Sequence, residues 1–189
     1  MKKLIIGVAG DVGSFSEQAA NEYTRRNDIA DYELRYLISV EKVLSTLDKG
    51  EIDLGIFPIE NSNGGVVIES VYAMSRYIFR IRDIFEIPVI HCLLTRKGTK
   101  KENIKNIASH DQALKQCKMY IKRQWSNAQL QETEDTAKAA KDLSEGKLND
   151  ETAVLAPESC ATLYGLMVME KGVQDLKFNF TNFLAVEKK

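Results

Sequence analysis

The stretch Leu54–Gly65, LGIFPIENSNGG, carries the clearest structural signal in this chain of 189 residues. Its first part is a short apolar run, which is typical of a buried β-strand. The segment Pro58–Gly65 then gathers a carboxylate, two amides, a hydroxyl and two glycines. Asparagine and glycine ordinarily mark a plain surface turn. Because this polar cluster follows a buried strand directly, we interpret it as a candidate binding or catalytic site.

Similar apolar runs recur on both sides of this stretch and alternate with helical patterns. The expected strands are Leu4–Ala9, Leu34–Ile38, Leu54–Phe57, Pro88–Leu94, Ala153–Ala156 and Phe183–Val186. The expected helices begin at Ser14 and Ser39, cover Glu69–Tyr77, Gln112–Lys122 and Thr136–Leu143, and run from Pro157 to Gly165. Their starts follow from hydroxyl caps and from proline at a first turn. This order predicts an α/β protein with mostly parallel sheets.

Composition limits the classes of partner. The net charge of −1 gives no field that would hold nucleic acid or an anionic membrane, so neither is an expected partner. No apolar run approaches the length of a membrane span. Lys2 and Lys3 before Leu4–Ala9 imitate a secretion signal, but the run is short and Asp11 ends it. We therefore expect a cytoplasmic protein.

Several kinds of catalytic site are not expected. There is no Walker A, HExxH or GxSxG pattern, and two histidines alone cannot build a three-ligand zinc site, so we expect no metal. The three cysteines lack a CxxC spacing and are interpreted as reduced, buried thiols. Cys117 shares an apolar helix face with Leu114 and Ile121, which favours a core position. His91 lies in an apolar segment and is interpreted as a core histidine.

Ligands of open α/β sheets bind beyond the carboxyl ends of strands, where helices begin. The turn Gly10–Ser16 offers N–H groups and the positive end of a helix dipole to an anion. Two further turns, Ser109–Gln112 and Thr133–Thr136, also precede helices. Taken alone, His110 and Asp135 there are interpreted as local helix caps. Nothing in the spacing of Asn179–Phe183 marks its threonine as catalytic.

Taken together, these turns resemble the prephenate dehydratase family, in the family's own order. The resemblance runs from Ile5 to about Val186. Three segments match recognisable family motifs: Pro58–Ser62 matches the most recognisable loop, Ser109–Leu114 the Ser-His-Pro-Gln segment, and Asn179–Phe183 the Thr-Arg-Phe signature. Gln116 and Cys117 extend the second of these. The resemblance also includes Gly13–Ala20 at the first helix start, Asp135–Ala137 and Tyr164–Leu166.

The resemblance implies a two-lobed, periplasmic-binding-protein-like fold of type II, with substrate in an interlobe cleft. Lobe 1 would comprise residues 1–83 with 176–189, and lobe 2 residues 84–175. The motifs run almost to the last residue, so no ACT regulatory domain is expected. The implied reaction converts prephenate to phenylpyruvate in L-phenylalanine biosynthesis, with loss of carbon dioxide and the ring hydroxyl, and without a cofactor or metal.

The resemblance also implies roles for particular residues. Thr181 falls on the catalytic threonine and would donate a hydrogen bond to the departing oxygen, while Glu60 would orient it or share the proton. The expected substrate-binding residues are Ser14, Asn61, Ser62, Gly64, Ser109, Gln112, Thr136, Asn182 and Phe183. Helix starts near Ser14, Gly64, Gln112 and Thr136 would bind the carboxylates of the dianionic substrate through N–H groups.

Some positions depart from the family pattern. Asn182 stands where the family has arginine, and Asp11 and Asp111 replace prolines. Two alternatives therefore stay open: a sister enzyme (a prephenate decarboxylase or an arogenate dehydratase), or a non-catalytic protein that binds an aromatic-pathway acid. Retention of Thr181 favours an enzyme. Family members often pair, so a homodimer is an alternative to the monomer; Leu166–Met169 is apolar enough to face a partner, although core packing would explain it equally well.

Overall fold

The computed structural model describes residues 3–189, so Lys2 lies outside the described residues. The chain divides into two compact units, the first made of the segments up to Pro88 and from Phe180, the second of Val89–Asn179. The chain changes unit after residues 88 and 179, whereas the expected positions were 83 and 175. The difference arises because the strands that contain Phe180 and Pro88 remain paired as far as these two residues.

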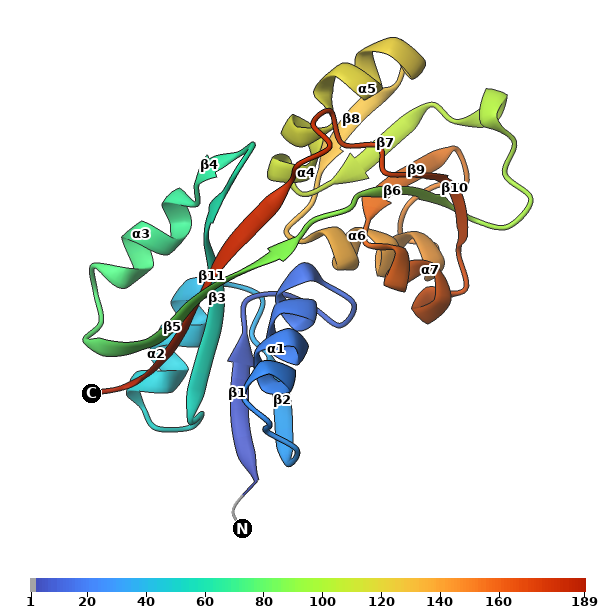
Figure 1. Cartoon of the computed structure of the whole chain (residues 1–189). Helices are drawn as coiled ribbons and strands as arrows, with labels where there is room; N and C mark the ends of the chain where they lie inside the picture. The colour runs from blue at the N-terminus through green and yellow to red at the C-terminus, as the bar shows by residue number, and fades with distance from the viewer. Residues whose placement is uncertain (1–2) are drawn as a thin grey trace. The chain divides into compact units, whose positions relative to one another are not determined.

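Unit 1 is built on a mixed sheet (Figure 1). Its strand order is β2 (Tyr32–Tyr36), β1 (Leu4–Val8), β3 (Leu54–Asn61), β11 (Phe180–Lys188) and β5 (Phe79–Pro88), and β4 (Gly65–Val66) pairs with β3. Strand β1 runs parallel to β2 and β3, but β11 is antiparallel to both of its neighbours. The expectation of mostly parallel sheets is therefore wrong, because the chain returns along β11 in the direction opposite to its departure along β5.

Three helices cover the two faces of this sheet: α1 (Phe15–Arg26), α2 (Val40–Asp48) and α3 (Ile68–Met74). The predicted caps of α1 and α2 are confirmed, since Ser14 Oγ accepts from Glu17 N and Ser39 Oγ accepts from Lys42 N, both at 3.3 Å. Side chains alternate between the faces of a strand. One face of β11 thus packs Phe183 into the cluster under α1, and the other packs Leu184 into the cluster under α2.

Unit 2 contains a second mixed sheet. Its order is β10 (Met167–Lys171), β6 (Cys92–Thr95), β9 (Thr152–Ala156), β7 (Asn106–Ser109) and β8 (Gln129–Glu132). Strand β7 is parallel to β8 and β9, whereas β6 is antiparallel to β9 and β10. The expected strand Pro88–Leu94 is divided between the end of β5 and the start of β6.

The helices of unit 2 are the 3₁₀ turn η1 (Lys101–Asn103), α4 (Asp111–Gln116), α5 (Lys118–Gln124), α6 (Thr136–Ser144) and α7 (Glu158–Tyr164). As predicted, α7 follows Pro157 and ends at Gly165, whose φ of 66° suits a glycine C-cap. The expected helix Gln112–Lys122 is broken at Cys117. Within residues 3–189, no helix is both long enough and apolar enough to cross a membrane.

Both residues interpreted as core are buried. Cys117 packs with Leu114 and Ile121, and burial raises the pKa of its thiol. Cys92 and Cys160 are likewise free and buried. His91 is 2% exposed, and burial lowers its pKa to about 4 although the hydrogen bond with Gln116 opposes the shift. These core interpretations are confirmed.

Candidate functional site

The ends of β3 and β11 bring Asn61 directly opposite Thr181. The Asn61 Nδ2 group donates to Thr181 Oγ1 at 2.8 Å and to the carbonyl of Phe180 at 3.0 Å. The other end of the same amide, Oδ1, accepts from the backbone N–H groups of Asn63 at 2.9 Å and Gly64 at 2.7 Å. The polar turn therefore fixes the orientation of the Asn61 amide, and the amide in turn holds the Thr181 hydroxyl.

Ser62 fixes the backbone immediately before Thr181. Its N–H donates to the Phe180 carbonyl at 2.9 Å, and its Oγ accepts from the Phe180 N–H at 3.0 Å. This reciprocal pair ties the turn after β3 to the first residue of β11. Asn61, Ser62, Gly64 and Thr181, which the sequence analysis selected from distant motifs, thus form one hydrogen-bonded cluster.

The contacts of Thr181 favour a role as a hydrogen-bond donor. The side chain is 8% exposed, and its oxygen accepts from Asn61. A threonine hydroxyl has one proton and two acceptor lone pairs. Because Asn61 supplies a proton to the oxygen, the hydroxyl's own proton must be directed elsewhere. The arrangement holds a buried hydroxyl with one of its two lone pairs occupied by the Asn61 N–H.

Glu60 and Asn182 belong to the opposite face of the same strands. They pair with each other across β3 and β11, and Asn182 also pairs with Glu86 of β5. Since successive side chains of a strand point to opposite faces, neither shares the face of Thr181. The expected role of Glu60 in orienting Thr181 is therefore not supported by the geometry, and Asn61 makes the orienting contact instead.

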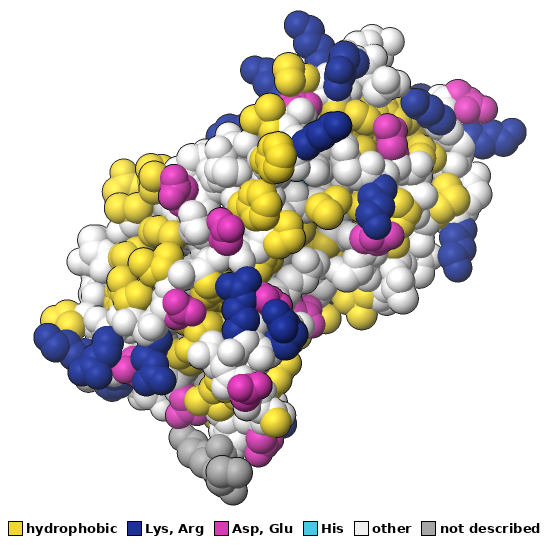
Figure 2. All heavy atoms as spheres, in the orientation of Figure 1, with side chains coloured by type: hydrophobic (Ala, Val, Ile, Leu, Met, Phe, Trp, Pro, Cys, Tyr) yellow, Lys and Arg dark blue, Asp and Glu magenta, His cyan; other side chains and the backbone are white. Residues whose placement is uncertain are grey.

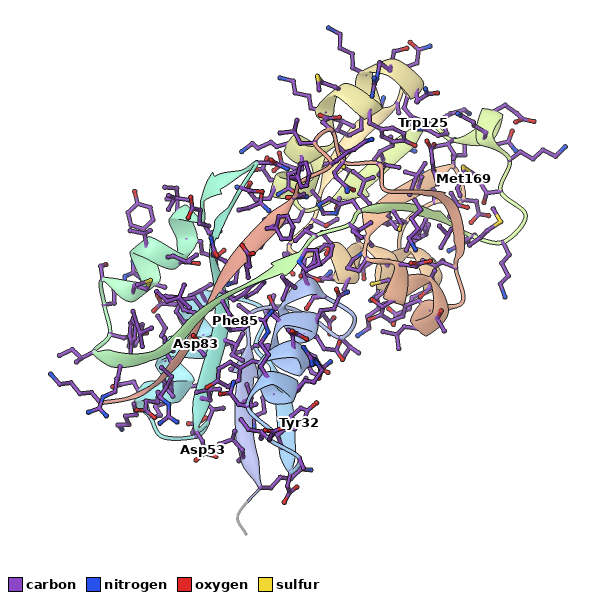
Figure 3. The ribbon with its side chains drawn as sticks, viewed as in Figure 1. Tyr32, Asp53, Asp83, Phe85, Trp125 and Met169 are labelled. Atoms are coloured by element: carbon purple, nitrogen blue, oxygen red, sulfur yellow. The ribbon has the colours of Figure 1, made fainter. Side chains whose placement is uncertain are left out.

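Phe183 shares the face of Thr181 but lies in the core. It is 1% exposed, and its ring stacks on that of Phe85 with the centroids 6.2 Å apart; Phe85 is labelled in Figure 3. The expectation that Phe183 contacts substrate finds no support in this packing, which assigns it to the core beneath α1.

Several of the N–H groups expected to bind substrate carboxylates already have acceptors within the chain. At the start of α1, Ser14 is 2% exposed and caps Glu17 N. The Gly64 N–H donates to Asn61 Oδ1. At the start of α6, Asp135 Oδ1 accepts from Ala137 N at 2.7 Å and from Lys138 N at 3.0 Å, which confirms the interpretation of Asp135 as a cap. These N–H groups serve local structure, and Thr136 itself is buried.

Ser109 and Gln112 lie in unit 2 around the start of α4. Ser109 is fully buried, and its Oγ donates to the Leu155 carbonyl at 2.6 Å. His110 Nδ1 accepts from Gln112 N at 3.2 Å, as expected of a local cap. The Oε1 atom of Gln112 is buried and has no hydrogen-bond partner among residues 3–189. A buried acceptor in this state costs roughly 1–3 kcal/mol, so Gln112 is well placed to accept from a donor on a ligand.

One buried polar network has no signal in the sequence pattern. Gln116 Oε1 accepts from His91 Nε2 and from Asn179 Nδ2, each at 2.8 Å. Gln116 and Asn179 appear in the sequence only as members of recognised motifs, and His91 only as a core residue. Their contact joins positions far apart in the chain, so local pattern carried no signal of it.

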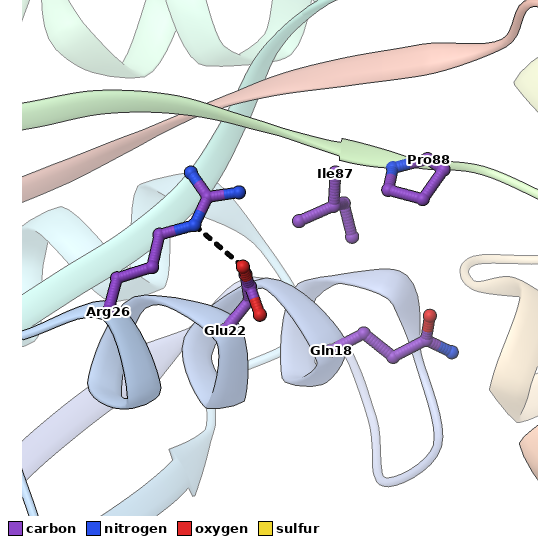
Figure 4. A pocket seen from close by; sticks show the side chains of 5 residues that line it. All are labelled: Gln18, Glu22, Arg26, Ile87 and Pro88. Carbon is purple, nitrogen blue, oxygen red and sulfur yellow. Dashed lines mark hydrogen bonds and ion pairs between the residues drawn. The ribbon is translucent and has the colours of Figure 1, made fainter.

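A surface pocket of about 290 Å³ lies beside α1 (Figure 4). Gln18, Glu22 and Arg26 line it together with Ile87 and Pro88. Glu22 pairs with Arg26 at 2.6 Å and with Arg25 at 2.8 Å, and these hydrogen bonds lower its pKa to about 2. The pocket therefore contains a solvated ion pair, and Thr181 does not line it. Within residues 3–189, no group of three or more metal-ligating side chains occurs.

Comparison with known proteins gives consistent results. A family model described as prephenate dehydratase matches residues 6–189. Arogenate dehydratase 1 of Petunia hybrida is 35% identical over 72% of this chain and 32% of its own length. The prephenate dehydratase of Methanocaldococcus jannaschii is 33% identical over 94% of this chain and 62% of its own length. The chain thus spans less than two thirds of these curated relatives.

Solved structures agree with the fold. The prephenate dehydratase of Arthrobacter aurescens in complex with L-Phe gives a TM-score of 0.82 at 26% identity, covering 98% of this chain and 60% of that one. The Staphylococcus aureus prephenate dehydratase gives 0.74 at 20% identity, covering 98% and 66%. An ABC transporter protein from Parabacteroides distasonis gives 0.56 at 12% identity, covering 100% and 67%. The expected two-lobed, periplasmic-binding-protein-like α/β fold is confirmed, and the expected substrate cleft stays a prediction.

Proposed function

The chain belongs to the prephenate dehydratase family, and we propose that it converts prephenate to phenylpyruvate in L-phenylalanine biosynthesis. Among the observations of the structure, the hydrogen bond from Asn61 Nδ2 to Thr181 Oγ1 carries most of the support. It orients the hydroxyl that the reaction needs, and it joins the two motifs on which the family resemblance depended most.

The reaction requires little covalent chemistry from the protein. The bond to the ring carboxylate breaks, its electron pair enters the ring, and the ring hydroxyl leaves; one proton is taken up, and the products are phenylpyruvate, carbon dioxide and water. Aromatisation drives these steps, so the protein must chiefly position the substrate and assist the departing oxygen. Thr181 would donate a hydrogen bond to that oxygen as negative charge develops on it.

Threonine is a poor acid, because efficient general acids have a pKa near the working pH. We therefore assign Thr181 the role of an aimed donor rather than a proton source, and Asn61 the role of holding it. Gln112 belongs to unit 2, and its buried Oε1 lacks a partner among residues 3–189, so a substrate contact of Gln112 stays a prediction. Glu60 and Asn182 are left outside this group because they occupy the other face of the sheet.

A second candidate function is arogenate dehydration. Its support is the 35% identity with Arogenate dehydratase 1. Arogenate carries an amino acid side chain where prephenate carries a keto acid, and the leaving hydroxyl is the same in both. The proposed role of Thr181 therefore serves either substrate, and the choice between them depends on contacts to that side chain.

Product identification tests the proposal. The purified protein is incubated separately with prephenate and with arogenate, beside enzyme-free controls, and the products are separated and identified. We expect phenylpyruvate from prephenate. Phenylalanine from arogenate at a higher rate would assign the second function. A non-aromatic dihydro product would indicate a decarboxylase, and binding without any product would indicate a sensor.

We also propose a cytoplasmic homodimer. All three cysteines are free and buried, as suits a reducing compartment. Figure 2 shows apolar side chains gathered over α3, where Ile68, Val71 and Tyr72 are exposed, and exposed apolar patches often mark an interface. Leu166, in contrast, is buried in the core of unit 2. Sedimentation equilibrium should give twice the mass of one chain, and the mass of a single chain would contradict the dimer.

A further inference from the structure

Three polar side chains are buried where the chain enters and leaves unit 2. His91 follows the first change of unit, Asn179 precedes the second, and Gln116 ends α4. Their exposed fractions are 2%, 2% and 8%, respectively. The Gln116 oxygen accepts one hydrogen bond from each of the other two, which uses both of its lone pairs.

Backbone hydrogen bonds join the same two segments. Val89 N donates to the Asn179 carbonyl at 2.8 Å. The His91 carbonyl accepts from Gly172 and Val173, both at 3.0 Å, and His91 N donates to Gln174 Oε1 at 3.1 Å. Residues 89–91, where the chain enters unit 2, therefore lie beside residues 172–179, where it leaves. The Gln116 side chain joins both segments to α4.

Only Phe180 separates Asn179 from Thr181, so the position of one constrains the other. Consecutive Cα atoms are about 3.8 Å apart, and the peptide planes between them are rigid. On the unit 1 side, Phe180 is held by Ser62 and Asn61. On the unit 2 side, Asn179 is held by Gln116. The Thr181 backbone thus follows two consecutive residues that are both held.

We propose that Asn179, held by Gln116 and His91, is a positioning residue for the Thr181 hydroxyl. The inference rests on the proposed function, since it concerns how that hydroxyl is aimed at the departing oxygen. Gln116 ends the short helix α4, so the network joins Asn179, the last residue of unit 2, to that helix. An error of about 1 Å in placing a reacting group can lower a rate by about 100-fold. A small shift of Asn179 that moves the Thr181 hydroxyl should therefore lower kcat.

The test compares Asn179→Ala and Gln116→Leu with the unmodified chain, using prephenate as the substrate. We expect kcat to fall by about 10- to 100-fold while KM changes by less than about threefold. Gln116→Glu retains a double acceptor and should restore most of kcat. Asn149→Ala is the matched control, because Asn149 Oδ1 holds a separate turn of unit 2 through Glu151 N and Thr152 Oγ1. The Asn149→Ala variant should have a lower free energy of unfolding and an unchanged kcat.

A double-mutant cycle distinguishes positioning from general destabilisation. If Asn179 acts through Thr181, Asn179→Ala should have little further effect on kcat once Thr181 is Val. Fully additive losses, or a kcat within about twofold of the unmodified value in both single variants, would overturn the inference.

Hydrogen exchange provides a readout that does not depend on activity. In Asn179→Ala, the amides of Phe180–Phe183 should exchange faster, while those of β1 should not change. If the unmodified chain does not convert prephenate, the proposed function fails, and exchange alone then decides the positioning inference. Faster exchange at Phe180–Phe183 would uphold it, and unchanged exchange would overturn it.

Discussion

At the scale of single residues, Asn61 explains why the turn after β3 is so polar. Its amide oxygen serves the backbone of the turn, and its amide nitrogen serves Thr181. A hydroxyl has one proton and a carboxylate has none, so neither could donate to both Thr181 Oγ1 and the Phe180 carbonyl as the Asn61 amide does. Glu60, one position earlier, points to the other face and makes no such contact.

His91 makes the stability of the fold depend on pH. Its pKa is lowered from 6.5 to about 4, chiefly by burial. Between these values the unfolded chain binds the proton more readily than the folded one, so stability is fully present above pH 6.5 and is lost as pH falls toward 4. The slope from this group is at most about 1.4 kcal/mol per pH unit.

Chemical denaturation at several pH values checks this prediction. His91→Gln, which keeps a donor toward Gln116, should flatten the dependence between pH 4 and 6.5. The chain has two histidines, so His110→Asn is a matched control that retains a helix cap and should keep the slope. An unchanged slope in His91→Gln would contradict the assignment.

Asn182→Arg should stabilise the fold rather than improve substrate binding. The position lies between Glu60 and Glu86 on neighbouring strands, on the face opposite Thr181. An arginine there would gain cross-strand pairs of about 0.2–1 kcal/mol each. We expect a higher midpoint of denaturation and an unchanged KM for prephenate. A clear fall in KM would mean that position 182 does reach the substrate.

Sequence patterns were informative at this scale where residue type sets the role, as with the caps Ser14, Ser39 and Asp135 and the buried His91 and Cys117. They carry no information on which face of a strand a side chain takes. Glu60, Asn61 and Ser62 read as one polar cluster, yet the register of β3 with β11 separates Glu60 from the other two. The irregularity at Asn182–Phe183 within that pairing has no signature in sequence.

At the scale of elements, the break between α4 and α5 depends on a distant residue. Asp175 accepts from Met119 N and Tyr120 N, both at 2.7 Å, and so caps the start of α5. The Asp175 N–H donates to the Gln116 carbonyl at 2.8 Å. Because this cap comes from more than fifty positions away, the apolar periodicity of residues 112–122 predicted one continuous helix.

Asp175→Ala should therefore destabilise unit 2. The loss of two capping hydrogen bonds should cost about 1–2 kcal/mol, as at other helix N-caps. Denaturation followed by Trp125 fluorescence measures the effect, because this single tryptophan is buried in unit 2. Ser39→Ala removes a cap from α2 in unit 1 and is the comparison. An Asp175→Ala midpoint equal to that of the unmodified chain would refute the capping role.

Two of the other unpredicted strands have little apolar signal in the sequence. Strand β8 (Gln129–Glu132) is exposed along its whole length, so it lacks the apolar face that marks a strand. Strand β4 comprises only Gly65 and Val66. The apolar strands β1, β3 and β9 were predicted because burial dictates their composition. The antiparallel direction of β11 was not predicted, because strand pairing depends on contacts between segments that are distant in the sequence.

At the scale of the molecule, each unit has its own core. Four apolar clusters occur among the described residues, two in each unit. Unit 2 is also continuous in sequence, since the chain enters it at Val89 and leaves it at Asn179. A domain with its own core can in principle fold alone.

A fragment of residues 89–179 should accordingly fold by itself. We expect cooperative unfolding and a blue-shifted emission from Trp125, which packs in a core of unit 2 (labelled in Figure 3). Circular dichroism and fluorescence should report coincident transitions. Red-shifted emission with a gradual, non-cooperative transition would contradict the independence of unit 2.

The central claim is that the Thr181 hydroxyl, held by Asn61, assists the departure of the ring hydroxyl of prephenate. Phenylpyruvate formation by Thr181→Val, which keeps the shape but not the hydroxyl, tests it most directly beside Thr181→Ser. Loss of one such donor should lower kcat by about 100- to 1000-fold, and serine should retain much of the activity while both variants stay folded. A Thr181→Val protein that forms phenylpyruvate at the unmodified rate would contradict the account.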